Sequence, residues 1–198
     1  MFTCASCQLH GCNSIENGKF PKNCPTIQKN ESDILTFYKE EENLNIAQAS
    51  AEVIAEGQLT RIEEIILFAK KCNYKTLGLA FCITLSKEAE TVAKIFRHHG
   101  FAVESIMCKN AAMPKQSIGL DSNAIMCNPI GQAQLLNEQK SDFNIILGLC
   151  VGHDTLFIKY SDAPVTILAV KDRVLEHNPL TAIRQADSKY KEKLFPMK

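Results

Sequence analysis

From Lys75 onward, the chain alternates short apolar segments with segments that carry the periodicity of helices, and this alternation restricts the fold more than any other feature. Apolar segments of about five to eight residues, separated by longer helices, are typical of parallel βαβ units. Because crossovers between parallel strands are right-handed, few strand orders remain. We therefore expect an α/β fold, a small three-layer structure with a parallel sheet of about four strands in an order near 2-1-3-4. The expected strands span residues 76–81, 101–107, 143–149 and 163–170, with helices over 86–99, 128–137 and 152–160.

The residues before this alternation fall into two parts. Residues 30–56 have a helical pattern, and Thr60 with Glu63 forms a capping-box signature for a second helix. The first thirty residues are different, because four cysteines stand among Asn, Gly, Lys and Pro with no sustained apolar periodicity. Such a segment cannot hold its structure by apolar burial alone. We predict a cysteine-rich metal-binding segment over residues 1–30 and an α/β domain over residues 31–198, with two helices ahead of the sheet.

Charge and hydropathy exclude several classes of partner. Lys and Arg number 22, and so do Asp and Glu, which gives a formal net charge of zero. Nucleic acid and anionic membrane surfaces both require a basic face, so neither is expected as the main partner. No apolar run approaches the ~20 residues of a membrane span. The first residues also lack the basic and apolar regions of a signal peptide, and we expect a cytoplasmic protein.

Cysteine is the residue type with the most chemical information in this sequence. The chain has nine cysteines, an odd number, and this is less than the ~8–10% that marks a disulfide scaffold. In a reducing compartment, grouped cysteines more often indicate metal binding or catalysis. Cys72 lies late in the second expected helix, and we interpret it as a packing residue.

Four of the cysteines lie where strands end or a helix begins. Cys82, Cys108 and Cys150 follow the first three expected strands, and Cys127 directly precedes the helix that starts at residue 128. The carboxyl ends of parallel strands share one edge of a sheet, where ligands commonly bind. Helix N-termini at that edge favour thiolate over thiol. We predict a shared cofactor site there, although reduced cysteine is also among the most commonly buried residues.

The other cysteine group lies at the front of the chain. Cys4, Cys7, Cys12 and Cys24 have the pattern C-x2-C-x4-C-x11-C, which provides four thiolates for one metal. A closed zinc site fits this donor set, and so does a [4Fe–4S] cluster, because Cys24 precedes proline as in ferredoxin-type runs. The spacing matches neither ferredoxin type, however. The alternative is a disordered thiol-rich tail.

Three other residues are candidates for catalysis at the edge of the sheet. His153 is expected within the first turn of a helix, where its imidazole could ligate metal or transfer protons. Asp154 follows it, and in the simpler interpretation it only complements the helix dipole. Lys109 stands beside Cys108 and could supply positive charge to an anionic substrate or a cluster, but such a lysine is more often solvated. Residues 171–173 follow the last strand at the same edge and could anchor a substrate.

Several segments together resemble a known family. They are the front cysteine set, YKEEENL (38–44), LTRIEEII (59–66), AFC (80–82), MCNPI (126–130), GLCVGHD (148–154), FIKYS (157–161) and VKDRVL (170–175). On these segments the chain resembles an uncharacterised cysteine-rich family of bacteria and archaea, labelled only as metal-binding protein and defined as a domain of unknown function. The resemblance implies metal binding but supplies no substrate.

The leading hypothesis is a metal-binding protein with one or two iron–sulfur clusters, or zinc, as cofactors. Iron–sulfur is favoured over zinc for the second site, because a closed structural zinc would have little to stabilise within a domain of this size. Such a centre would support redox or sulfur chemistry on a small molecule, or exchange electrons with a redox partner protein. Two alternatives remain open: a zinc-binding, non-catalytic interaction module, and a metal-free thiol redox protein. The sequence leaves open whether the protein is an enzyme.

Overall fold

The computed structural model describes residues 1–14, 18–27 and 31–197. The chain divides into two compact units, Met1–Gly57 and Gln58–Lys198. The first unit consists of the 3-10 turns η1 (Cys4–Ser6), η2 (Gly11–Asn13) and η3 (Pro25–Ile27), followed by α1 (Glu31–Tyr38) and α2 (Glu41–Ala55).

The helix expected over residues 30–56 is in fact two helices, α1 and α2. Residue 30 lies outside the described residues. Glu40 has an extended backbone and interrupts the helical path. The side-chain amide of Asn43 donates hydrogen bonds to the Phe37 carbonyl and to the Glu40 carboxylate, both at 3.0 Å. These bonds satisfy a carbonyl at the end of α1 and so stabilise the break.

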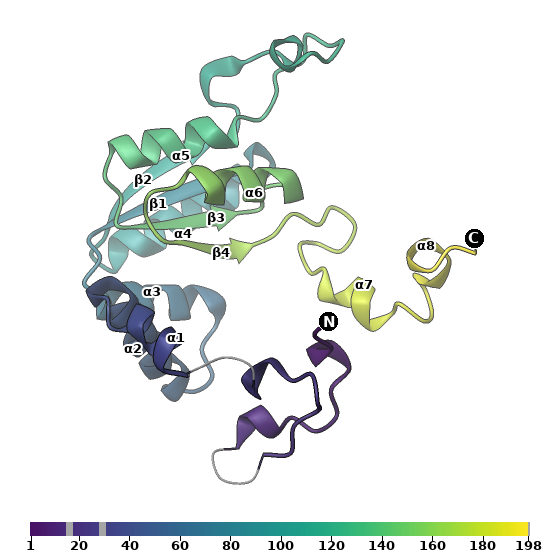
Figure 1. Ribbon diagram of the computed structural model, residues 1–198. Coiled ribbons are helices and arrows are strands. Elements are labelled where there is room, and N and C mark those ends of the chain that lie inside the picture. The colour runs from purple at the N-terminus through teal and green to yellow at the C-terminus, as the bar shows by residue number, and fades with distance from the viewer. Residues whose placement is uncertain (15–17, 28–30, 198) are drawn as a thin grey trace. The chain divides into compact units, whose positions relative to one another are not determined.

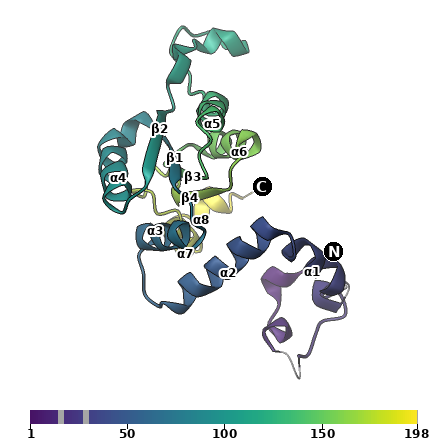
Figure 2. The same ribbon diagram turned by 90° about the vertical axis from the view of Figure 1, so that its left-hand side faces the viewer.

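The second unit contains the sheet, which has four parallel strands in the order β2-β1-β3-β4. Helices α3 and α4 pack on one face, and α5 and α6 pack on the other (Figure 1). Figure 2 shows α4 and the pair α5–α6 on opposite sides of the strands. The predicted three-layer α/β fold and its strand order are confirmed. The elements are α3 (Arg61–Lys71), β1 (Thr76–Phe81), η4 (Ile83–Leu85), α4 (Ser86–His98), β2 (Ala102–Met107), η5 (Asn110–Ala112), η6 (Lys115–Ile118), α5 (Pro129–Glu138), β3 (Phe143–Leu147), α6 (Val151–Tyr160), β4 (Val165–Ala169), α7 (Leu180–Arg184) and α8 (Lys191–Leu194).

Successive side chains of the central strands point to opposite faces of the sheet, and this explains why helices cover both faces. In β1, Leu77 and Leu79 are fully buried against α3 and α4, whereas Ala80 is buried in the cluster formed with α5 and α6. In β3, Ile145 and Ile146 divide in the same way between the two faces. Each large apolar side chain removed from water contributes about 1.5–3 kcal/mol. A strand that is apolar on both faces therefore requires helices on both sides.

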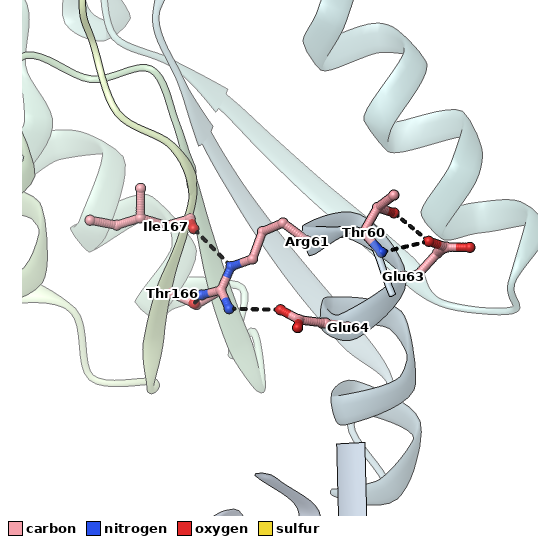
Figure 3. A network of polar contacts seen from close by, with 6 residues as sticks. All are labelled: Thr60, Arg61, Glu63, Glu64, Thr166 and Ile167. Carbon is pink, nitrogen blue, oxygen red and sulfur yellow. Dashed lines mark hydrogen bonds and ion pairs between the residues drawn. The ribbon is translucent and has the colours of Figure 1, made fainter. Parts of the chain in front are cut away.

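Helix α3 is fixed at both its start and its contact with the sheet. The predicted capping residues Thr60 and Glu63 do interact, since the Thr60 amide donates to the Glu63 carboxylate at 2.7 Å (Figure 3). Arg61 then reaches the edge strand β4, where it donates to the Ile167 carbonyl at 3.3 Å and to the Thr166 hydroxyl at 2.6 Å. Because this carbonyl of an edge strand already accepts a hydrogen bond, it is less available to pair with a strand of another chain.

None of the helices in the described ranges has both the length and the apolar character needed to cross a bilayer.

Candidate functional site

The backbone ladder continues past the ends of the central strands and brings their following residues together. The amide of Cys82, directly after β1, donates to the Leu147 carbonyl at the end of β3 at 3.1 Å. The amide of Cys108, directly after β2, donates to the Phe81 carbonyl at 2.9 Å. Cys150 lies three residues after β3 and is the N-cap of α6. These three cysteines therefore lie at one edge of the sheet, as the sequence predicts.

Cys127 joins this edge through the start of α5. The amide of Asn128, the N-cap of α5, donates to the Cys108 carbonyl at 2.7 Å, and its side chain accepts from the Gly131 amide. The side chains of Asn128 and Asn110 bond to each other at 2.9 Å. As a result the Sγ atoms of Cys127 and Cys108 lie 3.7 Å apart. We call Cys82, Cys108, Cys127 and Cys150 together the sheet-edge site.

The chain between Cys108 and Cys127 forms an arm (residues 109–126) that extends beyond the start of α5 (Figure 1). An isolated antiparallel bridge joins Pro114 and Ile125 within it. The ammonium group of the candidate residue Lys109 donates to the Ile125 carbonyl. Lys109 therefore holds the two sides of the arm together at its base, next to Cys108.

A lysine and a threonine accompany Cys82. The Sγ of Cys82 lies 3.3 Å from the Thr84 hydroxyl, which accepts a hydrogen bond from the Lys171 ammonium at 2.6 Å. Burial alone would raise the pKa of Cys82, but its hydrogen bonds with Thr84 and the nearby charge of Lys171 outweigh burial and lower this pKa. The interaction therefore favours the thiolate form of Cys82.

An arginine accompanies Cys150. Arg173 donates from Nη2 to the Cys150 Sγ at 3.3 Å, and this contact raises the pKa of the guanidinium. The loop that carries Arg173 is shaped by Asp172, whose carboxylate accepts from the amides of Val174 and Leu175 at 3.0 and 2.9 Å. The tight turn after β4 thus holds Arg173 beside the thiol.

Cys108 has a different environment from the other three cysteines of the sheet-edge site. It is almost fully buried, and its Sγ accepts a hydrogen bond from the Ile83 amide at 3.4 Å. Burial, reinforced by the neighbouring thiols of Cys127 and Cys82, raises the pKa of Cys108 to about 12. A thiol with such a pKa is a poor nucleophile at neutral pH, but a metal ion deprotonates a coordinating thiol outright.

The candidate residue His153 faces the cationic side of the site. It is half-buried, and burial together with the charges of Lys109 and Arg173 lowers its pKa. The imidazole is therefore neutral at physiological pH, and one ring nitrogen is free of a proton. Burial and the two cations disfavour the protonated imidazole, so His153 is a weak base whose free ring nitrogen is available to bind a metal.

Asp154 has one carboxylate oxygen that is buried without a hydrogen-bond partner among the described residues. This atom is Oδ1, which is inaccessible to solvent. Burial raises the pKa of Asp154 to about 6, well above its ordinary value of 3.8.

Because the folded-state pKa of Asp154 is raised, its contribution to stability is complete below about pH 4 and is lost as the pH rises through 6. We expect Asp154→Asn to increase the free energy of unfolding at pH 8 by about 1 kcal/mol, a value reduced for the partial exposure of the residue. At pH 4 the substitution should have little effect. Urea unfolding at the two pH values measures this difference, and an equal change at both would contradict the prediction.

The front cysteines lie in a series of tight turns. Cys4 begins η1, Cys12 lies within η2, and Cys24 directly precedes η3. Hydrogen bonds from the Thr26 side chain and from the amides of Thr26 and Ile27 lower the pKa of Cys24. Cys4 and Cys12 are exposed, whereas Cys7 and Cys24 are half-buried.

Neither predicted set of four cysteines, at the front of the chain or at the edge of the sheet, is arranged around a metal ion in the described residues. Within residues 1–14, 18–27 and 31–197, no group of three or more His, Cys, Asp or Glu side chains has the arrangement of a metal-ion site. In the sheet-edge site, the pair Cys108–Cys127 is close, while Cys82 and Cys150 lie beside their own cations.

Three residues of this region were not predicted from the sequence. Thr84 lies two residues after Cys82, and this closeness in the sequence is the feature that could have indicated its contact with the thiol. Gln132 is fully buried in α5, and its amide donates to the carbonyls of Ile106 and Phe81 at the ends of β2 and β1. His177 lies 2.8 Å through Nδ1 from the Val170 carbonyl and carries no signal in its local sequence.

The fold and these residues define a three-layer α/β protein with a cysteine-lined site at the carboxyl edge of its parallel sheet. The sequence matches the model of a family described as a protein of unknown function (DUF1847) over residues 23–168, and the chain belongs to that family. A relative from Methanocaldococcus jannaschii, described as uncharacterized protein MJ0455, is 51% identical over 157 residues. The match covers 76% of this chain and 81% of the relative. No solved structure matches the chain.

Proposed function

We propose that the protein is a thiolate metal protein whose sheet-edge site binds an iron–sulfur cluster, with a second metal on Cys4, Cys7, Cys12 and Cys24. The observation that supports this proposal most strongly is the meeting of thiols from separate segments, with the Cys108 and Cys127 sulfurs 3.7 Å apart. Two sulfurs bound to one tetrahedral metal with ~2.3 Å bonds are about 3.8 Å apart. This pair therefore already has the separation of two metal ligands.

The surroundings of the sulfurs also suit a cluster. Arg173 donates to the Cys150 sulfur, and Lys171 is linked to Cys82 through Thr84. Cations next to the sulfurs stabilise the thiolate form that metals require. A single ion would need all four sulfurs to meet at one point. In a [2Fe–2S] cluster each of the two iron atoms is bound by two cysteines, so Cys108 and Cys127 could share one iron while Cys82 and Cys150 bind the other.

The chain's other residues define what this centre would do. A bound cluster would supply electrons or a sulfur-binding metal. His153 stays in its neutral form, because its pKa is lowered by burial, Lys109 and Arg173, and it could then act as a weak base. We infer redox or sulfur chemistry on a small molecule, or electron exchange with a redox partner protein, in the cytoplasm, where thiols stay reduced. The balanced charge supports a role without nucleic acid.

Elemental analysis of the full chain, purified without oxygen, tests this proposal. We expect iron and acid-labile sulfide in the protein, with visible charge-transfer absorption. Zinc alone without visible absorption would overturn the iron–sulfur assignment, and absence of any stoichiometric metal would overturn metal binding altogether.

The same Cys108–Cys127 separation favours metal-free thiol redox chemistry as a second candidate function. Two thiols would then reduce a small disulfide, which releases two small thiols and leaves one protein disulfide. On this candidate, mild treatment of metal-free protein with oxidised glutathione should join Cys108 to Cys127. Mass spectrometry of the digested protein measures the link. Finding both thiols reduced, or only mixed disulfides, would contradict this candidate.

A further inference from the structure

Three cations lie near the sheet-edge site, and they come from two separate loops. Lys109 follows β2, whereas Lys171 and Arg173 follow β4. Their hydrogen-bond partners are neutral or thiol groups: the Ile125 carbonyl, the Thr84 hydroxyl and the Cys150 sulfur. In the described part of the chain, neither identified ion pair involves any of these three cations.

Two acidic residues of this region, Asp154 and Asp172, form no identified ion pair with these cations in the described part of the chain. Asp172 directs a carboxylate oxygen to two backbone amides of its own turn. Asp154 has a solvent-inaccessible oxygen without a partner among the described residues, and burial is the cause of its raised pKa, with no opposing effect of a nearby cation. His153 lies close enough to Lys109 and Arg173 for their charges to lower its pKa. Three cations without a carboxylate partner in the described part of the chain therefore lie beside the thiols.

Arg173 has the geometry to hold a further group. Its guanidinium is exposed, and only Nη2 is used in the contact with Cys150. A guanidinium carries five N–H donors in a planar fork, so donors remain for a second acceptor. The forked donors of a guanidinium bind the paired oxygens of a carboxylate or oxyanion more strongly than they bind a neutral acceptor.

We propose that the small molecule acted on at the sheet-edge site is an oxyanion or another small anion, which Arg173 holds next to Cys150 with support from Lys171 and Lys109. The inference rests on the proposed function, since it names the substrate class of the same site. Arg173 interacts electrostatically with Cys150, Cys82 and Cys127, and Lys109 and Arg173 both act on His153, so these cations form a group at one edge of the sheet. Such a group fits a compact anion better than a nucleic-acid strand.

Calorimetric titration of the full chain with sodium sulfate tests the inference. Dimethyl sulfone is the matched neutral probe, because it has a similar tetrahedral sulfur but no charge. We expect sulfate to bind and the sulfone not to bind. Arg173→Gln should weaken sulfate binding about tenfold or more, because it removes a charge-assisted fork. Arg173→Lys should lose part of the affinity, because it keeps the charge but not the fork.

Arg184→Gln, at the exposed end of α7, is the matched control and should leave sulfate binding unchanged. Lys171→Gln provides a second variant and should also weaken sulfate binding. Equal binding of sulfate and sulfone, no sulfate binding, or equal losses in Arg173→Gln and Arg184→Gln would overturn the inference.

Iron, sulfide and zinc are measured on the same samples. Arginine-dependent sulfate binding without metal would overturn only the metal proposal, and metal without sulfate binding would overturn only the anion inference.

Discussion

Replacing Cys150 by serine is expected to empty the sheet-edge site of metal while the front cysteines keep theirs. Cys150 is the N-cap of α6 and contacts Arg173 through its sulfur. A serine hydroxyl at this position is a poor ligand for iron or zinc compared with a thiolate. If both sites hold clusters of the same size, total iron should fall by roughly half. Iron and sulfide analysis of anaerobically purified protein measures the loss.

Cys72→Ala is the control for the Cys150 variant. Cys72 is buried at the end of α3, and burial raises its pKa, as for a thiol that serves packing. Its replacement should leave the metal content unchanged. An unchanged metal content in Cys150→Ser, or an equal loss in both variants, would contradict a shared site that includes Cys150.

The largest expected effect on stability comes from Phe157→Ala. Phe157 is fully buried in the cluster that packs α5 and α6 against the sheet, and this cluster also contains Cys82 and Cys108. Truncation of a buried phenylalanine removes apolar contacts and leaves a cavity, which costs about 3–5 kcal/mol. The free energy of unfolding from urea titrations at constant pH measures this change.

Ile158→Ala is the matched control, because Ile158 is the next residue of α6 but is 47% exposed. Its effect should be below about 1 kcal/mol, since much of the side chain remains in water in the folded state. Similar losses in the two variants would show that α6 does not pack against the sheet through Phe157.

The architecture of the second unit follows from local sequence signals. The short apolar segments around Leu79 and Ile145 require burial on both faces, and helices of sufficient length stand between them. The handedness of crossovers then restricts the strand order, which the structure confirms. The break between α1 and α2 could not be predicted in this way. It depends on Asn43, whose side chain competes for a carbonyl of the preceding helix.

The edge position of the cysteines also follows from the strand assignment, because residues after parallel strands share one edge. The partners of these cysteines do not follow from it. Arg173 reaches Cys150 through a turn shaped by Asp172, and Lys171 reaches Cys82 through Thr84. Such contacts join residues that are 23 and 87 positions apart, and side-chain geometry decides them. Sequence patterns record periodicity and turn chemistry but do not record these distances.

The central claim is that sulfurs from four separate segments hold one metal centre at the edge of the sheet. X-ray absorption on the full chain with Cys4, Cys7, Cys12 and Cys24 replaced by serine tests it most directly, because any remaining metal must be bound elsewhere. We predict bound iron with a first shell of sulfur alone. Loss of all metal from this variant, or a shell of nitrogen and oxygen, would contradict the claim.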